Sequence, residues 1–307
     1  MMKRMNNNNS VIVIKNKVNG ASIVRNIILL CVSLACITPL ILVISISFSN
    51  MQDIYEYGYR FIPRRIDFEA YKFILKEPKQ LVDSYITSIL MTVIGGSLSL
   101  VLTALIAYPM SRKDYIYRRP LSLYVVFTLL FNGGLVPWYI LITQYLRLGD
   151  NFWVLVLPYL VHALYVIILR TFFATIPAEM IEAAYIDGAN ELKIFTNIIL
   201  PMSKPALATV SLLIAFRYWN DWWLAMLFIS SPEKRPLQYM LYTVMSNIEE
   251  MEKNFQYYAS MQVGLEEFPK EPARMAMAVL AVGPMLFVFP FFQKYFAKGM
   301  TVGAVKG

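Results

Sequence analysis

The stretch TIPAEMIEAAYIDGANELKIFTNIILPMSKP, residues 175–205, carries the most informative pattern in this chain of 307 residues. Glutamates and small apolar residues recur at helical spacing in its first half, and the Asp-Gly pair at 187–188 is a turn signal because glycine tolerates a left-handed backbone. A second amphipathic run follows, in which Leu192, Phe195 and Ile199 share one helix face. The stretch predicts two short helices joined by a tight turn, too polar to lie in a membrane core.

The sequence on both sides of this stretch is apolar enough to cross a membrane. Hydrophobic residues make up 58% of the chain, charged residues only 16%, and the mean hydropathy is +0.52. A membrane-spanning helix needs about 20 mainly apolar residues. Six segments qualify, namely Ile27–Phe48, Ile86–Met110, Leu121–Thr143, Phe152–Phe173, Ala206–Ile229 and Met275–Phe296. The expected fold class is all-α, a polytopic membrane protein with six transmembrane helices and a cytoplasmic loop at 170–204.

The expected domain organisation follows from these spans. Residues 1–26 form a polar N-terminal arm, partly disordered, with a run of asparagines. Residues 27–296 form the six-span domain, and residues 297–307 form a C-terminal tail. The first span is not expected to be a cleaved signal peptide, because its apolar core is long and a polar stretch precedes it.

Basic residues predict the orientation of the spans. The N-terminal arm has five Lys and Arg residues and no acid, and the 111–119 loop has four bases against Asp114. Since cytoplasmic loops are enriched in Lys and Arg, both segments are expected in the cytoplasm, with both chain ends. The net charge of +8 therefore reports membrane orientation, and no nucleic-acid partner is expected. The predicted location is the bacterial cell membrane, in contact with the lipid bilayer.

The spacing of residues in the 175–205 stretch resembles a known signature. Glu-Ala-Ala at 182–184, then Gly188, then Ile-x-Leu-Pro at 198–201 is similar to the EAA signature of binding-protein-dependent ABC-transporter permeases. The resemblance implies coupling helices that sit in a groove of a cytoplasmic ATPase dimer. The residues implied in ATPase coupling are Glu179, Glu182, Ala183, Ala184, Asp187, Gly188 and Pro201. The alternative is a helix that rests on lipid headgroups, which the acidic balance of the loop disfavours.

The resemblance extends over most of the chain. FNGGLVPWYILI at 131–142, WNDWW at 219–223 and the terminal run at 290–307 resemble carbohydrate importers, especially the maltose-permease G-type half and its branch that serves complex oligosaccharides through lipoproteins. This implies a second homologous permease subunit and an external solute-binding lipoprotein, which the 230–274 loop can enter. It also implies that a glycine-rich tail reaches the ATPase interface. The tail residues are Gly299, Gly303 and Gly307.

The chain lacks the residues of an enzyme. It has no G-x-x-x-x-G-K-[ST] motif, so ATP hydrolysis is expected in a separate subunit. One histidine and two cysteines offer neither a metal cluster nor a nucleophile with its base. We expect no catalytic residues, no metal site and no cofactor.

Two charged residues in the predicted fifth span allow two interpretations. Arg217 and Asp221 stand four residues apart, and charge within a span is costly unless it meets a partner or a cavity. They form either an internal ion pair or part of the translocation path. The possible path residues are Arg217, Trp219, Asn220, Asp221 and Trp222. If Arg217 is not paired with Asp221, it favours an anionic sugar such as a uronate.

The sequence therefore predicts the permease subunit of an ATP-driven importer for oligosaccharides, with uronate-containing sugars as one substrate class. An importer for a non-sugar solute is the nearest alternative. A secondary transporter is a further one, disfavoured because the chain shows no internal repeat and few ionisable residues within the spans.

Overall fold

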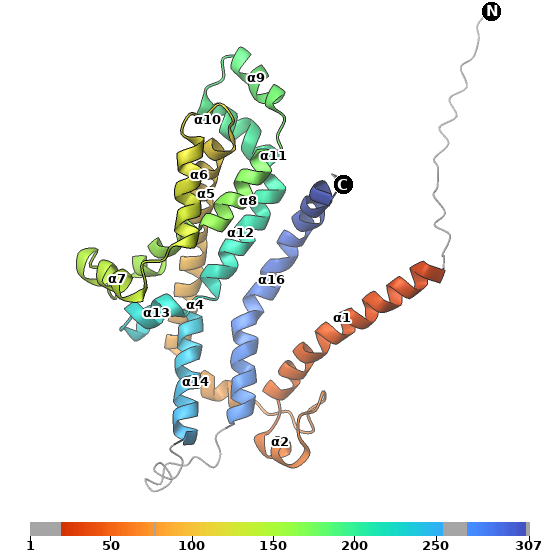
Figure 1. Ribbon diagram of the computed structural model, residues 1–307. Coiled ribbons are helices and arrows are strands. Elements are labelled where there is room, and N and C mark those ends of the chain that lie inside the picture. Colours follow the sequence, from red (N-terminus) through yellow and green to blue (C-terminus); the bar gives the residue numbers. More distant parts are fainter. Residues whose placement is uncertain (1–19, 77, 254–268, 305–307) are drawn as a thin grey trace, which may run out of the picture.

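The computed structural model describes residues 20–76, 78–253 and 269–304, which form a bundle of helices (Figure 1). Within these ranges no strand occurs, and one isolated bridge joins Ser49 to Ile66. The all-α fold class is confirmed. The longer helices are α1 (Gly20–Ser47), α4 (Pro78–Leu90), α5 (Gly96–Ser111), α6 (Arg118–Leu130), α8 (Ala163–Phe173), α9 (Ala178–Ile186), α12 (Lys204–Trp219), α14 (Leu237–Lys253) and α16 (Lys270–Ala304).

Shorter helices and single turns connect the longer ones. They are α2 (Met51–Tyr57), α3 (Glu69–Ile74), η1 (Met91–Gly95), α7 (Leu135–Ile140), η2 (Leu141–Tyr145), η3 (Phe152–Leu155), η4 (Leu157–Tyr159), α10 (Glu191–Ile194), η5 (Phe195–Ile199), α11 (Leu200–Met202), α13 (Trp223–Phe228) and η6 (Pro232–Lys234). The η segments are tight 3₁₀ turns or wide π turns. Because π turns often occur at functional sites, η5 in the second half of the 175–205 stretch is of particular interest.

Three described helices are long and apolar enough to cross a membrane unbroken. They are Ile23–Ser47, Pro78–Ser111 and Lys270–Phe291. Three further candidates are pairs of helices bent by more than 40° at a short break, so that the described residues hold up to six spans by length and composition. The last of the unbroken helices continues to Ala304, into the predicted tail. The division of the chain at residue 297 stays a prediction.

The predicted third span, Leu121–Thr143, is wrong as a continuous helix. The helix α6 ends at Leu130, and the helical segment Leu135–Tyr145 turns away from it by 109°. Between them the side chain of Asn132 accepts a hydrogen bond from the backbone N–H of Gly134 at 2.9 Å. Gly134 has a φ of +88°, a backbone conformation that residues other than glycine rarely adopt. The glycine pair therefore breaks the helix.

The predicted fourth and fifth spans are also interrupted. Within Phe152–Phe173, two 3₁₀ turns precede α8 and lie at 48° to it. Within Ala206–Ile229, α12 ends at Trp219, and Asp221 lies in the short segment beyond it. The prediction that Arg217 and Asp221 stand one turn apart on a single helix is therefore wrong.

The two ends of the molecule differ in what they carry. The helices α9 and α10 lie at one end, toward which the end of α16 points, and α2 and α14 lie at the other, while α1 extends away from the bundle (Figure 1).

A close approach between α12 and the π turn η1 stabilises the bundle. Tyr218 is fully buried, and its hydroxyl donates a hydrogen bond to the carbonyl oxygen of Val156 at 2.9 Å. Its ring lies against the backbone of Gly95, where a built Cβ would stand 2.7 Å from the ring atoms Cε1 and Cζ. Only a glycine leaves room for this ring.

Replacing Gly95 with alanine is therefore expected to lower the thermal stability of the purified protein in detergent. Overpacking of a tight core typically costs about 1–3 kcal/mol. Gly96→Ala is the matched control, because a Cβ there would have Ile214 Cγ2 as its nearest neighbour at 3.9 Å, an ordinary contact. Equal unfolding midpoints for the two variants would contradict the clash.

Candidate functional site

The turn between α9 and α10 has the geometry that its glycine suggests. Gly188 has a φ of +77°, and its N–H donates to the carbonyl oxygen of Tyr185 at 3.0 Å. The N–H of Ala189 donates to Ala184 at 2.9 Å, so that the end of α9 is closed by two backbone bonds. Asn190 then caps α10, since its side chain accepts from the N–H of Lys193 at 2.9 Å. The predicted pair of short helices with a tight turn is present.

The outer face of α9 presents charge and apolar surface without partners among the described residues. Glu179, Glu182 and Asp187 are exposed, and none of them forms an ion pair with another described residue. Ile186, on the same helix, is 86% exposed. Ile186 was not among the residues predicted from the sequence, although it lies directly before the Asp-Gly turn. Together these side chains form a surface suited to a groove of another protein.

The inner face of the helix pair packs on the bundle. Ile181 and Ile194 are buried, and Ala184 is half-buried against the main hydrophobic core, while Ala183 is exposed. Leu192 differs from its predicted partners on one face, because it is 66% exposed whereas Phe195 and Ile199 are buried. Leu192 lies in α10, before the π turn η5 that joins Phe195 to Ile199, and nothing in the structure explains its exposure.

The remaining residues predicted to meet the ATPase lie along the same end. Pro201 is exposed in α11, and the helical segment Glu191–Met202 meets α12 at an angle of 82°. Gly299 and Gly303 lie in the last turns of α16, so the chain is helical where a glycine-rich tail was expected. Gly307 lies outside the described residues.

Arg217 and Asp221 meet around the ring of Tyr159, at the junction of two interrupted spans. The guanidinium carbon of Arg217 lies 4.1 Å from the centre of the Tyr159 ring, and the Tyr159 hydroxyl donates to Asp221 Oδ1 at 2.8 Å. Asp221 is 7% exposed, and its Oδ2 accepts from the N–H of Leu224 at 3.2 Å. The Asp221 carboxylate is therefore satisfied by two donors of its own.

The guanidinium of Arg217 has no carboxylate partner within 4 Å in the described part of the chain. The side chain is half-buried at the end of α12, and its charge is stabilised by the face of an aromatic ring. Tyr159 organises both charged groups. Tyr159 was not predicted from the sequence, because a tyrosine within an apolar segment has no distinguishing pattern.

The other residues proposed for the path differ in their exposure. Trp219 is 4% exposed, and its indole N–H donates to the carbonyl oxygen of Ala281 at 2.9 Å, so it joins α12 to α16 and its ring is covered. Asn220 is exposed and donates to Phe216 at 2.9 Å. Trp222 is 36% exposed and stacks on Tyr242 with ring centres 4.7 Å apart. Of this group, Asn220 and Trp222 are the accessible ones.

His162 lies beside this junction. It precedes α8, its ring centre is 4.8 Å from that of Tyr165, and its Nδ1 is buried without a hydrogen-bond partner. Among the described residues no group of three His, Cys, Asp or Glu is placed to hold a metal ion. The junction is therefore a site of polar and aromatic contact.

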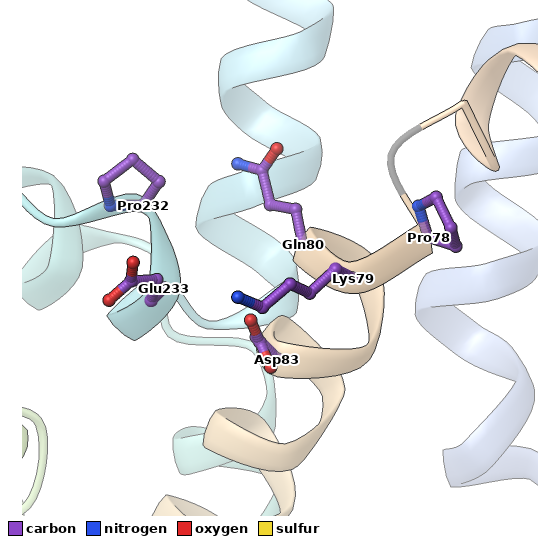
Figure 2. A pocket seen from close by; sticks show the side chains of 6 residues that line it. All are labelled: Pro78, Lys79, Gln80, Asp83, Pro232 and Glu233. Atoms are coloured by element: carbon purple, nitrogen blue, oxygen red, sulfur yellow. The ribbon is translucent and has the colours of Figure 1, made fainter.

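At the opposite end of the molecule a hollow of about 350 Å³ opens between the start of α4 and η6 (Figure 2). In Figure 2 the side chain of Lys79 extends from α4 toward η6. Two segments distant in the sequence, the start of α4 and the η6 turn, contribute to the hollow. Its lining residues are Pro78, Lys79, Gln80, Asp83, Pro232 and Glu233.

Comparisons with known proteins agree with this arrangement. Residues 99–302 match the family described as the binding-protein-dependent transport system inner membrane component. The chain is 39% identical over 279 residues to the polygalacturonan/rhamnogalacturonan transport system permease protein YtcP of Bacillus subtilis (strain 168), which covers 91% of this chain and 96% of that protein.

Two further proteins extend the comparison. The trehalose/maltose transport system permease protein MalG of Thermococcus litoralis is 28% identical over 279 residues, covering 90% of this chain and 93% of that one. Among solved structures, a bacterial ABC transporter involved in the import of the acidic polysaccharide alginate matches with a TM-score of 0.75 and 32% identity. The match covers 90% of this chain and 96% of that chain.

Proposed function

The chain belongs to the binding-protein-dependent transport system inner membrane component family, and we propose that it forms one half of the transmembrane path of an ATP-driven importer for acidic oligosaccharides. The family consists of transport permeases, so the chain is a transporter subunit and not an enzyme. The observation that carries the acidic substrate class is the Arg217 guanidinium, which lies at the junction of two interrupted spans without a carboxylate partner among the described residues.

The physical argument for an anionic sugar starts from the cost of a charge within a span. Such a charge is retained where it meets a partner or lines a polar cavity. Asp221 is already satisfied by Tyr159 and Leu224, which leaves Arg217 to meet an anion. A guanidinium binds a carboxylate through two parallel hydrogen bonds, which suits a uronate. The relatives named for polygalacturonan/rhamnogalacturonan and for alginate support the same class.

The partners follow from the surfaces at the two ends. The exposed acids of α9, with Ile186, are proposed to dock in a groove of a cytoplasmic ATPase dimer, to which the end of α16 also points. That subunit would carry ATP hydrolysis. A second homologous permease would complete the path. The surface around the hollow at α4 and η6 is proposed to dock an external solute-binding lipoprotein, which the 230–274 loop would enter. This assignment places both chain ends in the cytoplasm.

The mechanism of such an importer is alternating access. ATP binding would close the ATPase dimer, α9 and α10 would move with it, and the two permease halves would open to the outside to receive sugar from the binding protein. ATP and the loaded binding protein must each bind the outward-facing state more tightly than the inward-facing one. A ligand with equal affinity for both states shifts neither.

Arg217→Gln is expected to reduce uptake of a galacturonate trisaccharide roughly tenfold and to leave uptake of a neutral trisaccharide unchanged. Loss of a hydrogen bond to a charged group costs about 1.5–3 kcal/mol. Arg217→Lys is the matched control, because it keeps the charge but lacks the planar fork, and an intermediate loss is expected. Equal uptake of both sugars by wild type and Arg217→Gln would remove the role assigned to Arg217.

The proposed function itself is tested by the ATPase activity of the co-purified complex in lipid. The complex is assayed with its binding protein and a panel of neutral and uronate-containing oligosaccharides. Stimulation by the uronates alone supports the proposal. Stimulation by neutral sugars alone would keep the importer and reject the acidic class, and failure of any ATPase to co-purify would contradict the assembly.

A further inference from the structure

A cluster of polar side chains joins the end of α5 to both helices of the α9–α10 pair. It consists of Tyr108, Arg112, Asp114, Tyr185 and Glu191, and we call it the Glu191 cluster. Tyr108 lies on α5, Tyr185 in the last turn of α9 and Glu191 in the first turn of α10. None of these five residues is among those that the resemblance to the permease family implies in ATPase coupling, although Tyr185 and Glu191 lie within the 175–205 stretch.

The carboxylate of Glu191 is the centre of this cluster. Its Oε2 accepts a hydrogen bond from the Tyr108 hydroxyl at 2.5 Å, and its Oε1 accepts one from the Tyr185 hydroxyl. Burial and the bond to Glu191 raise the pKa of Tyr185, which keeps the phenol protonated as a donor at neutral pH. One carboxylate therefore connects a membrane-spanning helix to both helices of the pair.

Arg112 holds the cluster from its other side. Its guanidinium forms two hydrogen bonds to Asp114, at 2.9 and 2.6 Å, and lies 5.6 Å from the centre of the Tyr185 ring. Its Nη2 also reaches the Tyr185 hydroxyl at 3.4 Å. The hydrogen bond from Arg112 holds the pKa of Asp114 below its usual range, so the pair stays charged at neutral pH.

Local packing makes the position of Glu191 well defined. Asn190 caps the helix that Glu191 begins, and the ring of Tyr108 packs on buried Phe195 with centres 5.1 Å apart. Glu191 itself is exposed, and exposed hydrogen bonds contribute little to global stability because water competes for them. A cluster of this kind therefore has more effect on the orientation of α9 and α10 than on folding.

We propose that Glu191 is a positioning residue that fastens the α9–α10 pair to the end of α5, so that displacement of the pair by the ATPase is transmitted to the membrane-spanning bundle. The inference rests on the proposed function, since it requires an ATPase at α9 and α10. Without the Glu191 carboxylate, the pair would still dock but would move partly independently of α5. ATP would then be hydrolysed without a matching movement of sugar across the membrane.

The test uses the complete complex in proteoliposomes, with the ATPase, the partner permease and the binding protein loaded with a galacturonate trisaccharide. For Glu191→Gln and for Tyr108→Phe, sugar taken up per ATP hydrolysed is expected to fall roughly tenfold, equivalent to about 1.4 kcal/mol. The unfolding midpoint and co-purification of the ATPase are expected to stay as in wild type. Tyr117→Phe is the matched control, because Tyr117 is 63% exposed, five residues after Arg112, and its hydroxyl makes no hydrogen bond with the described residues.

The double variant Tyr108→Phe with Glu191→Gln completes the test. Glu191→Gln leaves one acceptor oxygen for the two phenols and removes the charge, so both changes weaken the Tyr108–Glu191 bond, and the double variant is expected to lose less than the sum of the two single losses. A wild-type ratio of uptake to hydrolysis in both single variants would overturn the inference, and so would a loss of co-purification in both. A wild-type complex whose ATPase ignores every sugar would instead contradict the proposed function.

Discussion

Replacing Gly188 with valine is expected to abolish sugar uptake while the chain still inserts into the membrane. The φ of +77° at Gly188 is a conformation that a β-branched residue adopts only with strain, about 1–3 kcal/mol for such positions. The strain is relieved by opening the turn, which separates α9 from α10 and displaces the surface proposed to meet the ATPase. Sugar-stimulated ATPase activity of the reconstituted complex is the measurement.

A control variant separates backbone strain from crowding. No atom lies within 4 Å of a Cβ built at Gly188, so added volume by itself meets nothing in this chain. Asparagine accepts a left-handed backbone more readily than valine, and Gly188→Asn is therefore expected to retain most of the activity. Normal stimulated activity in Gly188→Val would show that the turn geometry is not required.

Glu182→Lys is expected to have an effect of similar size by a different route. Glu182 is exposed on α9 and forms no ion pair with another described residue, so its charge is available to a partner. Removing one member of a desolvated charge pair typically costs about 2–5 kcal/mol, and inversion adds repulsion. We expect the ATPase to be lost from the purified complex and uptake to fall below detection.

The neutral variant Glu182→Gln shows whether charge or contact area matters at this position. It keeps the size of the side chain, so an intermediate loss of ATPase binding is expected. Since an exposed glutamate contributes little to folding, the unfolding midpoint of the isolated permease is expected to be unchanged in both variants. Full retention of the ATPase by Glu182→Lys would reject the charge anchor.

Much of the architecture follows directly from local patterns. The apolar segments predict a helical membrane protein, and the Asp-Gly pair at 187–188 predicts the turn that the positive φ of Gly188 confirms. These features depend on neighbours in the chain, since hydropathy acts over about 20 residues and a turn over four. The family resemblance rests on the same local stretch, and the match over residues 99–302 confirms it.

The breaks within the spans needed the tertiary structure. Composition alone treats Leu121–Thr143 and Ala206–Ile229 as continuous, because glycine is frequent in membrane helices and hydropathy is averaged over about 20 residues. In the folded chain, Gly134 takes a left-handed conformation and Asp221 is satisfied by the Tyr159 hydroxyl from another span. The break in the third span depends on the backbone conformation of Gly134, and the break in the fifth span depends on a partner distant in sequence. Hydropathy reports neither of them.

The same reason accounts for the two clusters that carry the proposals. Arg217 and Asp221 are close in sequence, yet the contacts that they make are to the ring and the hydroxyl of Tyr159, from another interrupted span. Glu191 receives one of its donors from Tyr108, 83 residues earlier in the chain. Local sequence determined that this chain is a helical membrane protein with a polar pair of helices within residues 175–205. Contacts between distant segments decided which charged side chains are already hydrogen-bonded and which remain available to a ligand or a partner. The physical reason is that a hydrogen bond requires two groups to be close in space, which their separation in the sequence does not reveal.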